Sequence, residues 1–248
     1  MSPEKNDVQP WFGSEVAWCL SLALGLGAFL VVAYAVTELL WRILGPATTA
    51  LIDSPVLSFV VSHRVGWLTA TMRQITRLGN EGLLLVVVVI AGSVLRRRTG
   101  SWRPLLILVA IAVGGVTIER VLKLVIARPR PPSRWMVVFE SGWSFPSGHA
   151  TRSAAVYGGM ACLTARLRAF GQRTQLMVWG LAIVLSFLIG ISRVYLGVHW
   201  PTDVVGGWIL AAGWLWIVLL ITGFMSETIL RRDVLVHEIE VTPKAGSS

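Results

Sequence analysis

The sequence predicts an all-α protein that crosses a membrane several times. Hydrophobic residues make up 54% of the 248 residues, charged residues make up only 14%, and the mean hydropathy is +0.69. These values lie far from those of soluble domains. Long apolar runs also alternate with short basic segments along the chain, which is the pattern of membrane-spanning helices.

Six apolar runs define six predicted transmembrane helices. Uninterrupted by charge, they are Val16–Thr37, Gly82–Leu95, Pro104–Ile118, Ser153–Ala165, Thr174–Ser192 and Val204–Ser226. A helix needs about 20 residues to cross the hydrocarbon core, and only the first, fifth and sixth runs reach that length unaided. The middle three must include neighbouring polar residues, namely Asn80 and Glu81, then Glu119, Arg120 and Lys123, then Ser147 to Arg152. We expect these residues to face the bundle interior or the interface.

The segment between the first two spans, residues 45–79, mixes Asp53, His63 and three arginines with apolar residues at helical spacing. We expect an amphipathic helical segment lying at the membrane interface. Two roles remain open for it. It could pack over the mouth of the bundle, or it could form a lip through which lipid reaches the interior.

The expected organisation is a cytoplasmic N-terminal segment (1–15), a membrane domain (16–226) and a polar cytoplasmic tail (227–248). The N-terminus lacks the basic region and cleavage site of a removable signal peptide. Cys19 and Cys162 lie in separate apolar runs and predict neither a disulfide nor a metal site. The net charge is +9. The basic residues lie at the ends of apolar runs and form no nucleic-acid-binding patch, so we expect no nucleic-acid partner.

The loops provide a prediction of topology. With six spans, the loop after the third span and the loop after the fifth lie on the same side of the membrane. The loops at Arg96–Arg103 and Arg166–Arg173, on the opposite side, contain basic residues and no acid. Short basic loops favour the cytoplasm, so we expect both termini in the cytoplasm and the loops after the third and fifth spans outside it.

Three polar clusters are predicted to meet on that outer side. They are Lys123-x6-Arg130-Pro131, Pro146-Ser147-Gly148-His149 and Ser192-Arg193-x5-His199-x3-Asp203. The step from His199 to Asp203 places both side chains on one face of a helical turn, where the carboxylate can hold the imidazole Nδ1 proton and leave Nε2 as nucleophile or base. An arginine nearby indicates an anionic target.

Each cluster alone has a simpler explanation. A Pro-Ser-Gly run is a common helix start, Lys123 could pair with Glu119 one turn earlier, and Arg128 and Arg130 could anchor the interface. In this order and at these spacings, however, the three clusters together resemble the signature of the type 2 phosphatidic-acid phosphatase superfamily. That superfamily includes membrane lipid phosphatases, glucose-6-phosphatases and vanadium haloperoxidases, and the resemblance covers residues 123–203.

The resemblance implies a role for each signature residue. His199 would attack phosphorus to give a phosphohistidine, Asp203 would orient it, and His149 would protonate the leaving oxygen and later activate water. The phosphoryl oxygens would be bound by Lys123, Arg130, Arg193, the Ser147 hydroxyl and the backbone N–H groups of Ser147 and Gly148. No metal or other cofactor is expected, because the remaining acids on that side are scattered: Glu38, Asp53, Glu81, Glu119 and Glu140.

The leading hypothesis is therefore a lipid phosphatase of the inner (cytoplasmic) membrane with an extracytoplasmic active site. Polyprenyl diphosphate, phosphatidic acid and phosphatidylglycerophosphate all remain candidate substrates. A competing hypothesis is an intramembrane serine hydrolase using Ser147 and His199, although no G-x-S-x-G motif surrounds Ser147. A lipid phosphotransferase with the same pocket also remains open. A haloperoxidase would be soluble, which the composition contradicts, and a transporter with buried charges would leave the spacing of the clusters accidental. The sequence does not determine the oligomeric state.

Overall fold

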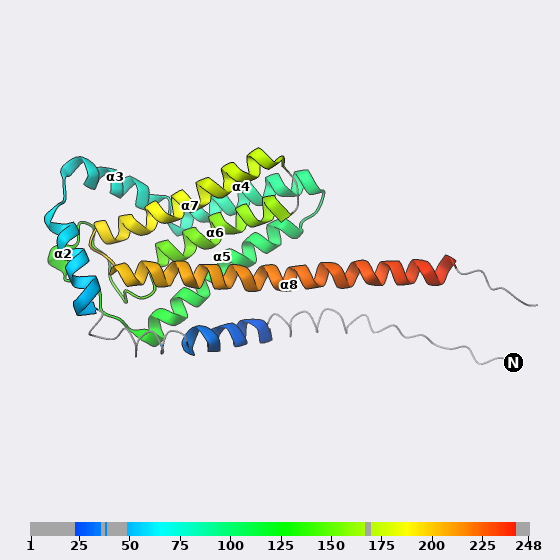
Figure 1. Cartoon of the computed structure of the whole chain (residues 1–248), viewed down its shortest axis with the longest axis horizontal. Helices are drawn as coiled ribbons and strands as arrows, with labels where there is room; N and C mark the ends of the chain where they lie inside the picture. The colour runs from blue at the N-terminus through cyan, green and yellow to red at the C-terminus, as the bar shows by residue number, and fades with distance from the viewer. Residues whose placement is uncertain (1–22, 36–37, 39–48, 167–169, 242–248) are drawn as a thin grey trace, which may run out of the picture.

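The computed structural model describes residues 23–35, 38, 49–166 and 170–241, and its regular elements there are all helical. The predicted segment 1–15, Cys19 and the first part of the first span lie outside the described residues. A helix covers Ala23–Ala35. It is followed by η1 (Thr49–Asp53), α2 (Ser54–Ser62), α3 (Gly66–Arg77), α4 (Glu81–Thr99), α5 (Arg103–Ile126), η2 (Ser133–Trp135), α6 (Gly148–Arg166), α7 (Gln172–Tyr195) and α8 (Pro201–Val241). Figure 1 shows the long helices lying roughly side by side.

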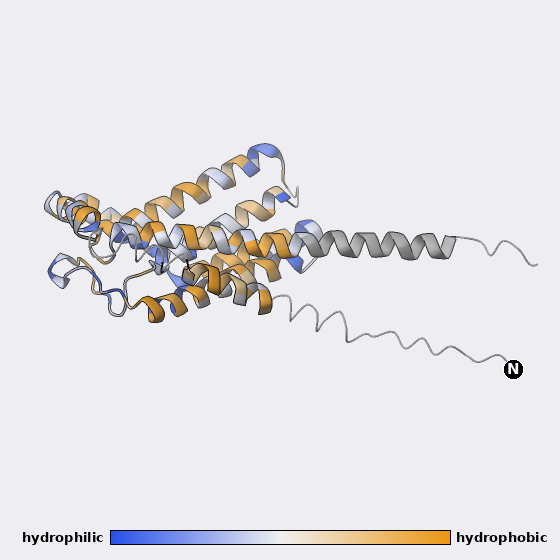
Figure 2. Cartoon of the chain, turned by 60° about the horizontal axis from the view of Figure 1, so that its bottom comes forward, coloured by the Kyte–Doolittle hydropathy of each residue, from blue (hydrophilic) through white to orange (hydrophobic). Residues whose placement is uncertain are grey.

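Helices α4 to α8 correspond to the predicted second to sixth spans, and the middle three include the polar residues named from the sequence except Asn80 and Ser147, which directly precede α4 and α6. Helix α4 begins at Glu81, α5 runs past Lys123, and α6 begins at Gly148 and includes Arg152. Helix α8 continues to Val241, beyond Ser226, where the sequence analysis ends the last span. Hydrophobic residues cover the middle of the helices, and hydrophilic ones gather toward their ends (Figure 2).

The part of the chain that the structure describes does not confirm the six predicted spans. Among the described residues, three helices are long and apolar enough to cross a membrane: α5, α7 and residues 201–223 of α8. A fourth span is obtained if α3 and α4, which meet at a bend of 53°, are counted together. Helix α6 is not among them, because it carries His149, Arg152 and several hydroxyl side chains.

The position of α6 explains its composition. It packs against α4, α5, α7 and α8, and Ala150, Ala155 and Ala161 on it are fully buried. Since other helices surround α6, small residues that permit close packing serve there in place of large apolar ones. The chain therefore places its least apolar long helix at the centre of the bundle.

The segment between the first two predicted spans folds into η1, α2 and α3, which lie across one end of the bundle (Figure 1). Its apolar side chains Val60, Leu68 and Met72 pack against the buried Leu196 and Val198 in the α7–α8 loop. Outward-facing Phe59 and Trp67 are exposed. The predicted helical segment is thus confirmed from residue 49 onward, and its packing over the end of the bundle agrees with the first of the two roles left open.

Candidate active site

The three predicted polar clusters meet at the end of the bundle that η1, α2 and α3 cover. Backbone hydrogen bonds join the loops there: Val137 N–H donates to the Leu196 carbonyl (2.9 Å), and Ser147 N–H donates to the Asp203 carbonyl (3.0 Å). The basic α4–α5 link and the last turn of α6, which carries Arg166, lie at the opposite end of the helices (Figure 1). The predicted convergence of the α5–α6 and α7–α8 loops at one end is therefore confirmed.

His199 and Asp203 form a buried pair, with exposed fractions of 1% and 0%. His199 lies in the turn before α8, while Asp203 is in the first turn of α8 and reaches back toward it. Asp203 Oδ2 accepts from Trp200 N–H (2.9 Å) and lies 3.3 Å from His199 Nδ1. His199 Nε2 lies 3.2 Å from Arg130 Nη1. The carboxylate therefore fixes the imidazole by Nδ1 and leaves Nε2 facing the cations, as the spacing predicts.

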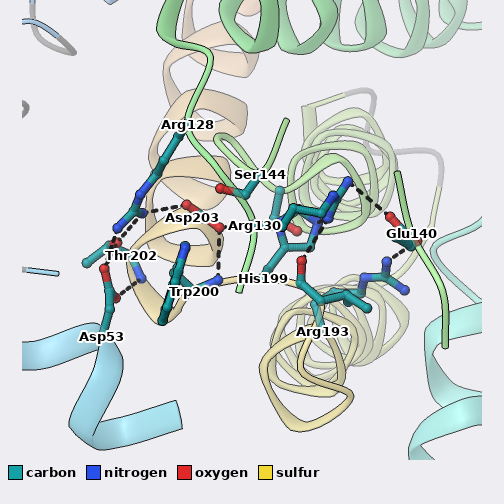
Figure 3. Close-up of polar contacts among 12 residues, drawn as sticks. Asp53, Arg128, Arg130, Glu140, Ser144, Arg193, His199, Trp200, Thr202 and Asp203 are labelled. Carbon is teal, nitrogen blue, oxygen red and sulfur yellow. Dashed lines mark hydrogen bonds and ion pairs between the residues drawn. The ribbon is translucent and has the colours of Figure 1, made fainter. Parts of the chain in front are cut away.

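Arg130 and Arg193 come from different clusters and share one acid, Glu140 (Figure 3). Arg130 Nη2 lies 3.2 Å from Glu140 Oε2, and Arg193 Nη2 contacts Glu140 Oε1. Arg193 is 2% exposed and also donates to Thr76 Oγ1 on α3 (2.8 Å). The sequence analysis treated Glu140 as one of several scattered acids. Its role as a bridge between two predicted phosphate-binding arginines becomes visible only when the loops are folded together.

Burial and the neighbouring charges together set the protonation states of Glu140 and His199. Burial opposes ionisation of Glu140, but the charges of Arg193 and Arg130 outweigh that effect and hold its pKa below the ordinary value. Burial lowers the pKa of His199 well below its ordinary value, and the positive charges of Arg193, Arg130 and Lys123 add to that effect. At neutral pH Glu140 is therefore an anion and His199 is a neutral imidazole with an available lone pair.

Two buried polar atoms in the predicted phosphate-binding set lack a partner among the described residues. Within the part of the chain that is described, the buried side-chain atoms without a hydrogen bond are Arg64 Nη2, Ser147 Oγ and Arg193 Nε. Leaving such groups unpaired is costly, and buried polar atoms normally find a partner. Two of the three belong to residues for which the sequence predicts contact with a phosphoryl group.

Ser147 differs from the prediction in one detail. Its backbone N–H donates to the Asp203 carbonyl, so this group is used to join α6 to α8 and does not face an anion. Gly148 is at the start of α6, and the side chains of Glu119 and Arg152 lie close to it. An added Cβ there would lie 2.6 Å from both Glu119 Oε1 and Arg152 Nη2. Both atoms are the ends of flexible side chains, so a larger residue here would displace Glu119 and Arg152 from their present positions.

Lys123 and His149 lie on the side of the site near α4. Lys123 Nζ is 2.9 Å from Glu119 Oε1, the simple pairing that the sequence left open. His149 Nε2 lies 3.0 Å from Asn80 Oδ1. Among the described residues, neither Lys123 nor His149 forms a hydrogen bond with His199. Their partners in the described chain are therefore Glu119 and Asn80, and not the His199 imidazole.

The sequence analysis missed a second set of buried polar residues behind His199. Arg128, 7% exposed, donates to Asp203 Oδ1 (2.6 Å) and to Asp53 Oδ2 (2.6 Å). Its interpretation as an interface anchor is wrong, because its guanidinium is buried between two carboxylates. The dipeptide Arg128-Pro129 directly precedes Arg130-Pro131, and this repetition was the available signal.

Among the described residues, no group of three His, Cys, Asp or Glu side chains could hold a metal ion.

Comparison with known proteins identifies the family. Residues 103–225 match the PAP2 superfamily. Phosphatidylglycerophosphatase B of Bacillus subtilis (strain 168) is 38% identical over 172 residues, which are 69% of this chain and 82% of that protein. The chain belongs to the PAP2 superfamily. The resemblance inferred from the three clusters is thus confirmed. The match to the family extends beyond residues 123–203 on both sides.

Two further relatives of this PAP2 protein are informative. The undecaprenyl-diphosphatase of Sulfolobus acidocaldarius is 29% identical over 164 residues, which are 64% of this chain and 71% of that protein. The crystal structure of the transmembrane PAP2 type phosphatidylglycerolphosphate phosphatase from Bacillus subtilis has a TM-score of 0.69 and 33% identity, and covers 80% of this chain and 96% of that one. The apolar helices and this structural likeness make the chain a membrane PAP2 protein.

Proposed function

We propose that this PAP2 protein is a membrane phosphatase that removes a phosphate group from a lipid phosphate or diphosphate. The observation that carries the proposal is the position of His199 Nε2 beside Arg130, together with Arg193 Nε and Ser147 Oγ, which find no partner among the described residues. A transferring phosphoryl group spreads negative charge over its oxygens, so catalysis depends mainly on positioned positive charge and hydrogen-bond donors. Arg130 lies beside the nucleophilic nitrogen, and Arg193 Nε and Ser147 Oγ are the further donors that we assign to the phosphoryl oxygens.

The proposed reaction has two steps through a phosphohistidine. The His199 Nε2 lone pair attacks phosphorus, the bond from phosphorus to the leaving oxygen breaks, and His149 gives that oxygen a proton. The imidazole becomes positively charged in this step, and Asp203 at Nδ1 balances the charge. Water then attacks the phosphohistidine while His149 takes its proton, which releases phosphate and restores His199. Arg130, Arg193 and Lys123 stabilise the phosphoryl oxygens in both steps.

The relatives guide the choice of substrate. Their names specify phosphatidylglycerophosphate and undecaprenyl diphosphate, which share a phosphate group at the end of a lipid. A site at the end of an apolar bundle can reach such a head group while the hydrocarbon chain stays in the bilayer. We therefore propose a lipid carrying a terminal phosphate or diphosphate as the substrate class, in an inner (cytoplasmic) membrane.

The test is phosphate release by the purified full-length protein from a panel of lipid phosphates in detergent. The panel contains phosphatidylglycerophosphate, phosphatidic acid and a polyprenyl diphosphate, with His199→Ala as the matched inactive variant. Orthovanadate should inhibit, and serine-directed fluorophosphonates should not. Inhibition by fluorophosphonates together with activity in His199→Ala would support a serine hydrolase instead. Transfer of label to an added alcohol and not to water would make the protein a phosphotransferase.

The proposed topology has six spans, with both termini in the cytoplasm and the active site on the extracytoplasmic side. The basic links at one end of the helices support this orientation. Thr99 is the last residue of α4 and Ser133 lies in the α5–α6 loop at the other end of the helices, and both residues are exposed. Single cysteines at these positions, in a protein without Cys19 and Cys162, should react differently with an impermeant maleimide applied to intact cells. Labelling at position 133 alone supports the orientation, and labelling at position 99 alone reverses it.

A further inference from the structure

We call η1, α2 and α3, which lie over the site end of the bundle, the covering segment. Asp53, at the junction of η1 and α2, is a fully buried carboxylate in this segment. The sequence analysis assigned no chemistry to Asp53. It lies outside residues 103–225, which match the family. Its Oδ1 accepts from Thr202 N–H (3.0 Å), and its Oδ2 accepts from Thr202 Oγ1 (2.7 Å) and Arg128 Nη2 (2.6 Å). Every one of these contacts lies at the start of α8 or on the arginine behind it (Figure 3).

Arg128 connects Asp53 with Asp203. Its Nη2 contacts Asp53, and its Nη1 lies 2.6 Å from Asp203 Oδ1 and 2.8 Å from Thr202 Oγ1. One guanidinium is therefore shared by two carboxylates that are both fully buried. Because charges interact strongly away from water, the hold of Asp53 on Arg128 limits how far that cation can neutralise Asp203.

The charge and position of Asp203 matter for the proposed reaction. Its other oxygen, Oδ2, lies 3.3 Å from His199 Nδ1, and the imidazole becomes positive as Nε2 attacks phosphorus. A carboxylate that Arg128 neutralised or displaced would stabilise that charge less well. We propose that Asp53 is a positioning residue for this reaction, which holds Arg128 so that Asp203 keeps its place and its charge toward His199. The inference rests on the proposed phosphatase function.

Attachment of the covering segment does not by itself require this buried acid. Arg64, in the α2–α3 link, donates to the Tyr195 carbonyl (2.8 Å) and to the Trp135 carbonyl (2.8 Å). Apolar side chains of α2 and α3 pack on the same loop. Burying a carboxylate costs free energy that packing alone would not. Arg64 thus provides a control, because its substitution loosens the same segment without touching Arg128 or Asp203.

The experiment compares Asp53→Asn with Arg64→Gln in the full-length protein. The substrate is p-nitrophenyl phosphate in detergent, and the measurements are kcat, KM, the single-turnover rate of phosphoenzyme formation and the melting temperature. Loss of a residue that orients a catalytic partner typically costs about 10- to 100-fold in activity. We expect a fall of that size in kcat and in phosphoenzyme formation for Asp53→Asn, with KM unchanged. Asp53→Glu should recover part of the loss, and Arg64→Gln should lower the melting temperature while keeping kcat.

Three results would overturn the inference. They are wild-type kcat in folded Asp53→Asn, a fall in kcat no larger than that of Arg64→Gln, and a change confined to KM. If Asp53→Asn does not fold, Thr202→Val removes the hydroxyl between Asp53 and Arg128 and should lower kcat, and wild-type kcat in that variant would overturn the inference. If the wild-type protein releases no phosphate from any substrate, the proposed function fails as well. If the wild-type protein releases phosphate and both Asp53→Asn and Arg64→Gln have its kcat, the phosphatase function stands and only the positioning role of Asp53 fails.

Discussion

Replacing Arg193 by lysine tests the proposed binding of the phosphoryl group most directly, because Arg193 is buried and only some of its nitrogens are paired within the described chain. Nη1 donates to Thr76 Oγ1 and Nη2 contacts Glu140, while Nε has no partner among the described residues. A bound phosphate would complete this set. Lysine keeps the charge but has a single nitrogen, which cannot hold two structural contacts and also reach phosphate oxygens.

The expected loss can be worked out from these contacts. A hydrogen bond to a charged group contributes about 1.5–3 kcal/mol, and each 1.4 kcal/mol corresponds to about tenfold. One lost contact therefore predicts at least about a tenfold fall in kcat/KM. If the contact strengthens as charge develops, as at an oxyanion site, the loss is on the order of 10²-fold and appears in kcat.

The assay is phosphate release from a lipid phosphate and from p-nitrophenyl phosphate, with the affinity for orthovanadate as a second measurement. Arg64→Lys is the matched control, since that arginine at the same end donates to two main-chain carbonyls. It should keep kcat/KM while lowering the melting temperature. Folded Arg193→Lys protein with wild-type kcat/KM and vanadate affinity would refute the assignment of Arg193 to the phosphate.

The site leads to three more predictions. Rapid quench with labelled p-nitrophenyl phosphate should trap an acid-labile phosphoenzyme in His149→Ala, because a good leaving group needs little protonation, and none in His199→Ala; acid-stable label would indicate phosphoserine. Activity should survive EDTA, because arginines and a lysine provide the positive charge, and restoration by magnesium after loss would contradict the mechanism. Glu140→Gln should lower the melting temperature at neutral pH: a depressed pKa stabilises the fold above the ordinary glutamate pKa, and that contribution is lost as pH falls through the folded pKa. The difference from wild type should therefore shrink in acid, and a constant difference would contradict the ion bridge.

The sequence predicted the positions of the helices well because hydrophobicity and spacing are local properties. The second to sixth apolar runs became α4 to α8, and most of the polar residues that lengthen the middle runs lie on those helices. The sequence did not predict which helix the others would surround. Whether a helix faces lipid or other helices depends on its neighbours, and α6 is enclosed by four of them, so its composition alone does not reveal that it is central.

The signature residues were found in the sequence because each cluster has a fixed spacing. The pairing of His199 with Asp203 follows from a separation of four residues, which one turn of chain brings together. The structure placed them within 3.3 Å. Loop parity also predicted that the clusters meet at one end of the bundle, without any knowledge of how the helices pack.

Tertiary structure decided which acids and cations share the buried space around that pair. Glu140 bridges Arg130 and Arg193, and Asp53 shares Arg128 with Asp203. Except for Arg130 and Glu140, which share the α5–α6 loop, these partners are far apart in the sequence, and no spacing connects them. Their contacts arise because the covering segment and the α5–α6 loop fold over the same end of the bundle. Once buried there, each charge needs an opposite charge or hydrogen-bond partner, and only the packing of the loops determines which one it finds.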